Sequence, residues 1–207
     1  MTSSVPWQER LSAGTEAVQD DVIRQYERTK QGKAYAPHMV WGTLQTEDYA
    51  TVILKQVVDF LGVPDDASAG VAKRMERQRV LYDGEHHYDV ILGEQALYTN
   101  IGGPEVMRAA QVDRLFRDID LPSLTLGILP ATARVSMFPV PGFGILGDGD
   151  TVNVELVSTG VDITDASEVA LHQKAFALLR EKAAYGDAAK DLIRKARSFW
   201  DSAPLQE

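Results

Sequence analysis

The sequence predicts an α+β fold: a single domain in which a small, mostly antiparallel sheet packs against N- and C-terminal helices. Apolar side chains recur at helical spacing over the first 84 residues, and helical spacing returns after residue 165. Between these regions the apolar residues form short runs bounded by Gly and Pro, which is typical of strands. At 207 residues, the chain is long enough to bury a substantial core without a cofactor or a disulfide.

Composition excludes several classes of protein. The sequence has 30 acidic and 21 basic residues, and its net charge of −9 opposes contact with phosphate polyanions, so we expect no direct nucleic-acid partner. It has no cysteine, which excludes disulfides, thiolate metal sites and a cysteine nucleophile. Neither a signal peptide nor an apolar run of about 18 residues occurs. We therefore expect a cytoplasmic protein with no membrane partner and no cofactor.

The first two predicted helices occupy residues 5–31 and the region after Thr46. The first is amphipathic, with a one-turn recurrence of Val18, Val22, Ile23 and Tyr26. Thr46 can cap the second, whose first turn carries Glu47 and Asp48, where the helix dipole favours negative charge. This helix should end near Gly62.

A third helix and the first strand follow. The helix begins after Asp66 or Ser68 and stops at Gly84, because glycine is favoured just past a helix end. The apolar run Val90–Leu92 then predicts a buried strand, and the polar residues 93–95 after it predict a loop suited to function.

The second half of the chain returns from helix to strand and back to helix. Pro104 can start a helix over residues 102–122. Its inner face is predicted to carry Val106, Met107, Ala110, Leu115 and Phe116. Residues 123–130 predict a strand stopped by Pro130, and residues 142–157 predict a hairpin with its turn at Asp148–Gly149. Two helices, at 165–186 and 187–200, close the chain, the first with Asp165 or Ser167 as its cap.

Two motifs invite a cofactor or metal assignment. Gly142, Gly144 and Gly147 spell G-x-G-x-x-G, but a turn and a strand follow them instead of the helix N-terminus that holds a pyrophosphate, so we interpret them as hairpin glycines. His86 and His87 lie beside Asp83 and Glu85, yet adjacent histidines in a strand point to opposite faces. We therefore expect no metal and interpret these residues as a solvated turn.

Glu94 is a candidate functional carboxylate. It comes directly after a buried strand, where burial would raise its pKa or require a basic partner. Arg74, Arg77 and Arg79 on the preceding helix are candidates for that partner. The alternative is a structural ion pair that ties the helix to the sheet, and the sequence does not decide between the two.

Residues 39–54 and 135–143 are candidate walls of a pocket. The first combines a capped helix with two aromatics, Trp41 and Tyr49, beside the polar Gln45. The second holds Phe138 and Phe143 in a loop between strands. Apolar residues in such a loop either plug the core, which we favour because an exposed apolar patch is unfavourable, or line a small-molecule site.

Five segments together resemble a known family of regulatory domains. They read VIRQYERTKQ, MVWGTLQTEDYATVIL, RMERQRVL, VILGEQALYTNIGGPEVM and LPSLTLGILP. In this order, across about residues 22 to 180, they resemble the uncharacterised C-terminal domain that follows helix-turn-helix in many actinobacterial transcriptional regulators. The matching positions are Gln45, Thr46, Tyr49, Ala50, Arg77, Gln78, Glu94, Ala96, Leu97, Leu129 and Pro130.

The resemblance implies a sensor domain. The family is thought to sense small molecules or partner proteins and to sit beside genes for short partner proteins, in antitoxin-like pairs. It implies a linker-like helix at residues 1–36, a sensor-like α+β domain at 37–200 and a disordered tail at 201–207, with the family's DNA-binding domain missing. Two departures stand out: Trp41-Gly42-Thr43 replaces proline-glycine-leucine, and the loop 135–143 is bulkier and more apolar.

Two functions are compatible with these observations. The first is a stand-alone small-molecule- or partner-binding regulatory protein without its own DNA-binding domain. The alternative is a cofactor-free enzyme of specialised metabolism, a cyclase, isomerase or lyase, with Glu94, Tyr49 or Tyr98 as acid or base. Candidate partners are a small apolar or amphipathic molecule, a short partner protein, a helix-turn-helix protein and a second copy of the chain. The predicted pocket is lined by Trp41, Gln45, Tyr49, Arg77, Glu94, Tyr98, Phe138 and Phe143.

Overall fold

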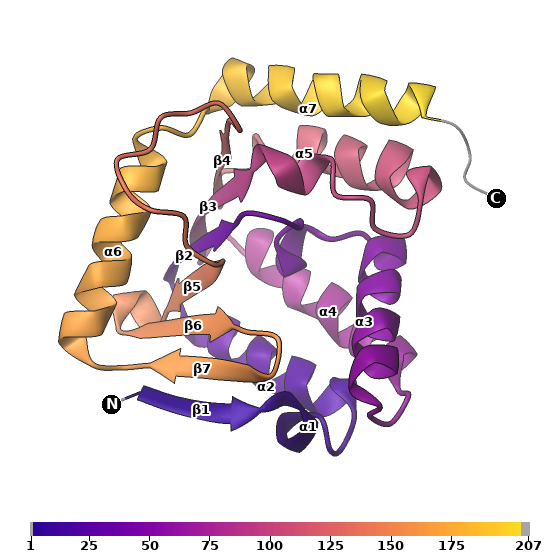
Figure 1. The fold of residues 1–207 in the computed structure, drawn as a ribbon, viewed down its shortest axis with the longest axis vertical. Helices are drawn as coiled ribbons and strands as arrows, with labels where there is room; N and C mark the ends of the chain where they lie inside the picture. The colour runs from indigo at the N-terminus through magenta and orange to yellow at the C-terminus, as the bar shows by residue number, and fades with distance from the viewer. Residues whose placement is uncertain (1, 204–207) are drawn as a thin grey trace.

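The protein is a single α+β domain built on one seven-stranded sheet (Figure 1), as the sequence predicts. The computed structural model describes residues 2–203, and the side chains of all of these except 108–110. The strands are β1 (Thr2–Pro6), β2 (Gln31–Ala36), β3 (His87–Gly93), β4 (Leu124–Leu129), β5 (Phe143–Leu146), β6 (Thr151–Glu155) and β7 (Thr159–Ile163). Their order across the sheet is β1-β7-β6-β5-β2-β3-β4.

The sheet is mostly antiparallel, which confirms the predicted fold class. Strands β1, β7, β6, β5 and β2 pair antiparallel in that order, whereas β2, β3 and β4 pair parallel. In the parallel part, Lys33 of β2 is the partner of Asp89 of β3, which in turn is the partner of Thr125 of β4. In-register residues of parallel strands share a face, so these three polar side chains form a row on one face of the sheet.

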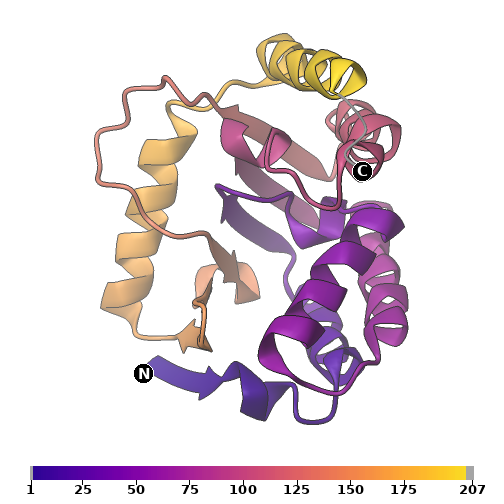
Figure 2. The same cartoon turned by 45° about the vertical axis from the view of Figure 1, so that its right-hand side comes forward.

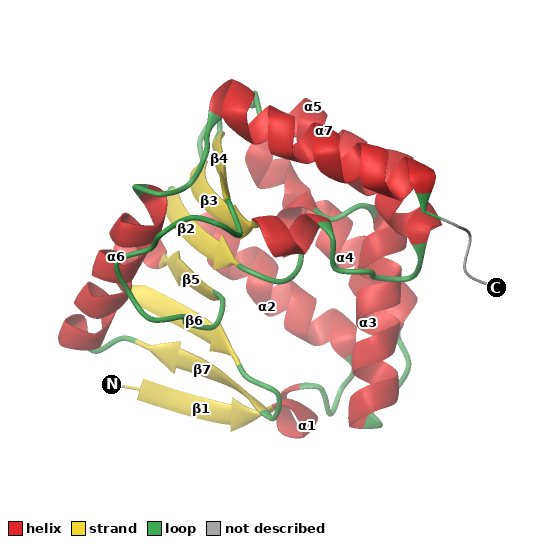
Figure 3. Ribbon diagram, turned by 45° about the horizontal axis from the view of Figure 1, so that its top comes forward, coloured by secondary structure: helices red, strands yellow, loops and turns green. Residues whose placement is uncertain are grey.

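Helices cover both faces of the sheet. They are α1 (Trp7–Arg10), α2 (Thr15–Arg28), α3 (Glu47–Leu61), α4 (Ala67–Arg77), α5 (Asp113–Asp118), α6 (Ala166–Arg180) and α7 (Gly186–Ser202). Helix α6 stands alone on one side, while α2 to α5 pack on the other, and α7 lies beside α5 at the β4 edge (Figures 1 and 2). Figure 3 shows the strands as one layer between α6 and the other helices.

Two apolar clusters fill the space on either side of the sheet. Alternate residues of β3 divide between them, because successive side chains of a strand point to opposite faces. Ile91 packs with Phe176 of α6, whereas Tyr88 and Leu92 pack with Tyr26 of α2 and with residues of α3, α5 and α7. Burial on both sides explains why β3 reads as a short apolar run.

The helix signals read from the sequence are confirmed where a cap determines the boundary. The Thr46 hydroxyl accepts a hydrogen bond from the Tyr49 backbone N–H at 3.4 Å. Gly62 ends α3 in the left-handed conformation, with φ of 62°. Asp165 accepts hydrogen bonds from the backbone N–H groups of Ser167 and Glu168, and so caps α6.

Two predicted helices differ from those observed. The segment 5–31 is divided between β1, α1 and α2, and its last residue begins β2. The predicted helix 102–122 contains a π-helix at Val106–Val112 followed by α5, and Phe116, predicted to face inward, is 37% exposed. A π-turn rotates the residues that follow it around the helix axis relative to an α-helix, which displaces Phe116 from the buried face.

The described structure has no boundary near residue 36. Strands β1 and β2 belong to the same sheet as β3 to β7, so residues 2–36 are part of the domain and the predicted linker-like helix is corrected. At the other end, α7 continues to Ser202, two residues into the predicted tail, and residues 204–207 lie outside the described residues. Among residues 2–203, no helix is long and apolar enough to span a membrane.

Gly93, the last residue of β3, allows a close backbone contact. A Cβ at this position would lie 2.5 Å from the Pro37 carbonyl oxygen, and a backbone atom cannot easily move away. We therefore expect Gly93→Ala to lower the free energy of unfolding by about 1–3 kcal/mol, the usual effect of overpacking. Urea unfolding measures this, with Gly144→Ala as control because its Cβ would meet its nearest atom at 4.0 Å. Equal losses in both variants would contradict the explanation.

Candidate functional site

Four of the predicted pocket residues are buried together on the side of the sheet that packs against α2 to α5. Trp41, Gln45, Tyr49 and Arg77 are each no more than 7% exposed. The Trp41 indole N–H donates to the Tyr26 hydroxyl at 3.0 Å. The Tyr49 hydroxyl accepts from the Val40 N–H at 3.3 Å, and burial raises the pKa of Tyr49 to about 12. These residues are packed and hydrogen-bonded within the core.

Glu94 and Tyr98 lie at the carboxyl end of β3. Glu94 starts a 3-10 helix, Glu94–Leu97, and its Oε2 accepts a hydrogen bond from the Ala131 N–H at 2.7 Å. Among the described residues, none of the candidate arginines 74, 77 and 79 forms an ion pair with Glu94, and a backbone N–H holds the carboxylate instead. Tyr98 packs edge-on against Phe199, with ring centroids 5.4 Å apart, and burial followed by the charge of Glu94 raises its pKa.

Phe138 and Phe143 are separated from the other six residues. Phe138 is 76% exposed, in the loop that connects β4 to β5. Phe143 is buried on the α6 side, against the rings of Tyr35 and His172 at 5.9 and 5.2 Å. The eight residues therefore lie on two faces of the sheet and in solvent, and do not line one cavity.

The glycine motif and the adjacent histidines, considered above for a cofactor and a metal, have structural roles. His86, 8% exposed, contacts Asp83 Oδ2 at 2.6 Å and the Glu27 carbonyl at 3.1 Å, so it is a buried side chain and not part of a solvated turn. Within residues 2–203, no group of three or more His, Asp or Glu side chains is placed to hold a metal ion. Gly147 and Asp148, with φ of 59° and 57°, form the turn between β5 and β6, which confirms the predicted hairpin.

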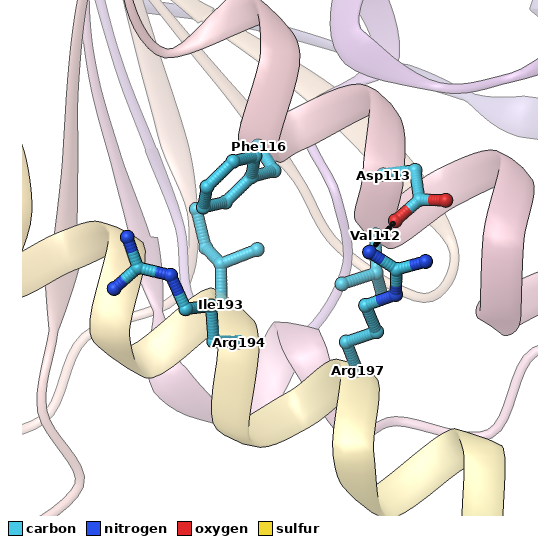
Figure 4. Close-up of a pocket in the computed structure, with 6 residues that line it drawn as sticks. All are labelled: Val112, Asp113, Phe116, Ile193, Arg194 and Arg197. Atoms are coloured by element: carbon cyan, nitrogen blue, oxygen red, sulfur yellow. Dashed lines mark ion pairs between the residues drawn. The ribbon is translucent and has the colours of Figure 1, made fainter.

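One small pocket lies between α5 and α7 (Figure 4). It measures about 160 Å³, and Arg194 and Arg197 extend from α7 toward it. Arg194 stacks over the Phe116 ring at 5.2 Å, and Arg197 pairs with Asp113 at 3.2 Å. Because small-molecule sites usually measure about 300–1,000 Å³, and because both cations already have partners, this pocket is a poor candidate.

A larger pocket, of about 400 Å³, lies at the C-terminal end of α6, the upper end in Figure 1. Its wall is formed by Ala177, Arg180, Glu181 and Tyr185. The Tyr185 ring packs directly against Gly127 of β4, where a Cβ would lie 2.7 Å from two ring atoms. The glycine thus allows an aromatic wall to contact the sheet directly.

Asp89 lies on the sheet next to this pocket. The Arg180 guanidinium donates from Nε to Asp89 Oδ2 at 2.7 Å and links the pocket wall to the carboxylate. The other polar residues of the row have their own partners: the Lys33 ammonium donates to Gln173 Oε1 at 2.5 Å, and the Thr125 hydroxyl contacts His87 Nε2 at 3.0 Å. The neighbouring polar side chains of the half-buried row are therefore engaged elsewhere, and Arg180 is the one hydrogen-bonding partner of Asp89 among the described residues.

Two oxygens beside the pocket have no protein partner. Asp89 Oδ1 and Tyr185 Oη are both shielded from solvent, and neither makes a hydrogen bond within the described chain. Burial raises the pKa of Asp89, against the opposing charge of Arg180. Burial, with the charge of Asp89, raises the pKa of Tyr185 to about 12. Each unpaired buried group costs about 1–3 kcal/mol, so the arrangement is unfavourable without a binding partner.

The sequence held a weak signal for this site. In HYDVIL, the alternation places Asp89 on the same face as Ile91, so a carboxylate points toward a covered side of the sheet. The apolar run covers only residues 90–92 and therefore predicts a strand without Asp89, whereas β3 begins at His87. Tyr185 follows α6 by several residues and carries no motif.

Comparison with known proteins identifies a family and two distant structural similarities. Residues 20–195 match the model of a domain of unknown function, DUF5753. No curated protein matches the sequence. TrmBL2, an archaeal chromatin protein with a novel mode of DNA binding, is 15% identical over 88% of this chain, with a TM-score of 0.41. NucT from Helicobacter pylori is 9% identical over 90% of this chain and 99% of its own, with a TM-score of 0.46. The chain spans only 51% of the TrmBL2 chain, and at these TM-scores neither similarity carries a functional argument.

Proposed function

The chain belongs to the DUF5753 family, and we propose that it is a regulatory protein that binds a small molecule in the pocket at Arg180 and Tyr185. The observation that carries the proposal is the pair of unpaired oxygens, Asp89 Oδ1 and Tyr185 Oη, beneath an open surface pocket of about 400 Å³. A ligand that bonds to both removes a cost that the free protein bears.

The groups around the pocket specify the kind of ligand. Asp89 Oδ1 needs a hydrogen-bond donor, such as an amine or a hydroxyl. The Tyr185 hydroxyl can donate or accept, and the Arg180 guanidinium suits a carbonyl or carboxylate oxygen. Ala177 and the Tyr185 ring add apolar surface. These features favour a compact amphipathic molecule with an amine or hydroxyl close to an acidic or carbonyl oxygen.

The pocket adjoins the N-terminus of α7. Tyr185 is the residue before that helix, and the neighbouring Ala184 is bonded to Ile128 of β4 through two backbone hydrogen bonds of 2.8 and 2.9 Å. A ligand that holds Tyr185 would also hold the start of α7, whose Ile193 and Trp200 pack in the core. Together with the resemblance to sensor domains of helix-turn-helix regulators, this supports a role in which α7 transmits ligand binding to a partner protein.

A cofactor-free enzyme is the second candidate, on a different set of residues from those predicted. Tyr49 is fully buried, which disfavours the trio of Glu94, Tyr49 and Tyr98. Asp89, with its raised pKa, and Tyr185, which stays protonated at neutral pH, are instead a candidate base and acid. Chemical change of a bound ligand during incubation with the protein would favour the enzyme, and release of the same molecule unchanged would favour the regulator.

Ligand-observed NMR with a library of amino acids, amino alcohols and hydroxy acids tests the proposal. We expect binders of the wild type to lose about two- to tenfold in affinity for Tyr185→Phe, the equivalent of one hydrogen bond. Tyr98→Phe is the matched control and should bind as the wild type does, since Tyr98 packs against the apolar cluster on the opposite face of the sheet. Equal binding by Tyr185→Phe and the wild type would count against this pocket.

A further inference from the structure

A second charged site lies on the opposite face of the sheet, where α4 packs against α2. Arg74 and Arg77 are neighbours on α4, and both donate to the same side-chain oxygen, Gln19 Oε1. The distances are 3.3 Å from Arg74 Nε and 3.4 Å from Arg77 Nη1. Arg77 is 5% exposed and Arg74 is half-buried, so two positive charges lie side by side below the surface.

The other partners of the two guanidinium groups are neutral. Arg74 Nη1 donates to Gln45 Oε1 at 2.7 Å, and Arg77 Nε donates to Thr43 Oγ1 at 3.1 Å. Arg77 also stacks over the Tyr26 ring at 4.9 Å. Within residues 2–203, neither arginine forms an ion pair with a carboxylate, and unpaired buried charge is strongly unfavourable.

Each guanidinium has one nitrogen left for another partner. The Nη2 groups of Arg74 and Arg77 donate to no acceptor in the described part of the chain. Gly42 leaves room for one of them, because a Cβ at this position would lie 2.5 Å from Arg77 Nη2. The absence of a side chain at Gly42 therefore leaves Arg77 Nη2 uncovered on that side.

We propose that Arg74 and Arg77 bind a phosphate-type oxyanion through their two free Nη2 groups, with Gln19 holding the guanidinium groups in place. Paired guanidinium groups match a tetrahedral oxyanion in both charge and hydrogen-bond geometry. This site is separate from the pocket at Tyr185, because the two lie on opposite faces of the sheet. The ligand can be free phosphate or the phosphate group of a larger metabolite.

The surrounding charges support an anion here. Burial, and for Arg74 also the charge of Arg77, lowers the pKa of both arginines, that of Arg74 to about 10. Glu155, exposed at the end of β6, is the carboxylate whose charge raises the pKa of both. Because it is close enough to act electrostatically yet forms no ion pair with them, Glu155 would compete weakly with a bound anion.

Isothermal titration calorimetry with inorganic phosphate at constant ionic strength tests the proposal. We expect the wild type to bind phosphate, and Arg74→Gln to bind about ten- to a hundredfold more weakly, the usual effect of losing a charge-assisted contact. Glu155→Gln should bind severalfold more tightly because a negative charge is removed. Arg79→Gln is the matched control: this arginine pairs with Glu27 and Glu76 on the surface, and the variant should bind as the wild type does.

Three results would overturn the site. They are no phosphate binding by either the wild type or Glu155→Gln, equal binding by Arg74→Gln and the wild type, and binding of acetate in preference to phosphate and sulfate. Arg74 is half-buried, so its variant should fold even if Arg77→Gln does not. A phosphate monoester such as glycerol phosphate, titrated in parallel, separates the two sources: tighter binding than phosphate indicates a larger metabolite, and equal binding indicates the free ion.

Discussion

Replacement of Arg114 by Met is expected to lower the free energy of unfolding by about 3–5 kcal/mol, the usual cost of breaking a buried ion pair. Arg114 is 7% exposed, and its Nε pairs at 3.0 Å with Asp118, which is 2% exposed. Arg114 Nη1 also donates to the Gln45 carbonyl at 2.7 Å and to Gln78 Oε1 at 2.9 Å. The substitution leaves a buried carboxylate and buried acceptors without this partner.

Arg117 is the internal control for that prediction. It contacts the other oxygen of Asp118 at 2.9 Å, but its own side chain is 70% exposed. Exposed ion pairs contribute little, so Arg117→Met should cost less than about 1 kcal/mol in the same urea unfolding experiment. Similar losses in the free energy of unfolding for the two variants would show that the burial of Arg114 does not determine its contribution.

Asp89→Asn is expected to make the protein more stable at pH 7 and to weaken ligand binding at the pocket about tenfold or more. The folded protein raises the pKa of Asp89 above its ordinary value of 3.8, chiefly through burial. Because the pKa is raised, Asp89 contributes favourably to the free energy of unfolding below pH 3.8. This contribution is lost as the pH rises through the folded-state pKa. At neutral pH the wild type therefore carries an ionisation cost that the Asn variant lacks.

Thermal unfolding of both proteins between about pH 4 and pH 8 measures this effect. The stability advantage of Asp89→Asn should nearly vanish at the acid end of this window, grow as the pH rises through the folded-state pKa of Asp89, and then stay constant. Asp162→Asn is a suitable control: Asp162 also sits in a strand and pairs with an arginine, Arg10, and accepts a hydrogen bond from Asn153. Its replacement breaks these contacts and should not stabilise. If Asp89→Asn were less stable than the wild type at pH 7, the claim that ionised Asp89 lowers the stability of the free protein would be contradicted.

The sequence predicted those parts of the fold that local chemistry determines. Thr46 and Gly62 define α3 because a side-chain cap and a left-handed glycine act within one helical turn. Strand β2, QGKAYA, was missed because its glycine and lysine resemble a loop, and it becomes a strand through pairing with β3 and β5. Long-range pairing of this kind leaves little trace in local residue preferences.

The candidate site was harder to predict than the fold. Asp89 and Tyr185 are 96 residues apart and meet only because β3, β4 and the end of α6 come together. By contrast, several residues that carry the resemblance to sensor domains prove to be structural. Gln78 donates to the Gln45 carbonyl, and the Thr46 N–H donates to Gln111 Oε1. Arg114 and Gln111, which lie outside the resembling segments, donate to the carbonyls of Gln45 and Leu44 and hold the same buried loop before α3.

This network also explains why a polar stretch looks like a binding site in the sequence. Gln45 is fully buried, and both polar atoms of its side-chain amide are used: Nε2 donates to the Val40 carbonyl at 2.8 Å and Oε1 accepts from Arg74. Polar residues whose hydrogen bonds are satisfied stabilise a conformation, whereas Asp89 Oδ1 and Tyr185 Oη are shielded from solvent without a hydrogen-bond partner in the described chain, which is the partner that the proposed ligand would supply.

Native mass spectrometry of the protein purified from its own host tests the central claim most directly. The wild type and Asp89→Asn would be purified side by side, and anything released on denaturation would be identified. A small amphipathic molecule bound to the wild type and absent from Asp89→Asn is the predicted result. The same molecule bound equally to both proteins would contradict the assignment of the ligand site to Asp89, Arg180 and Tyr185.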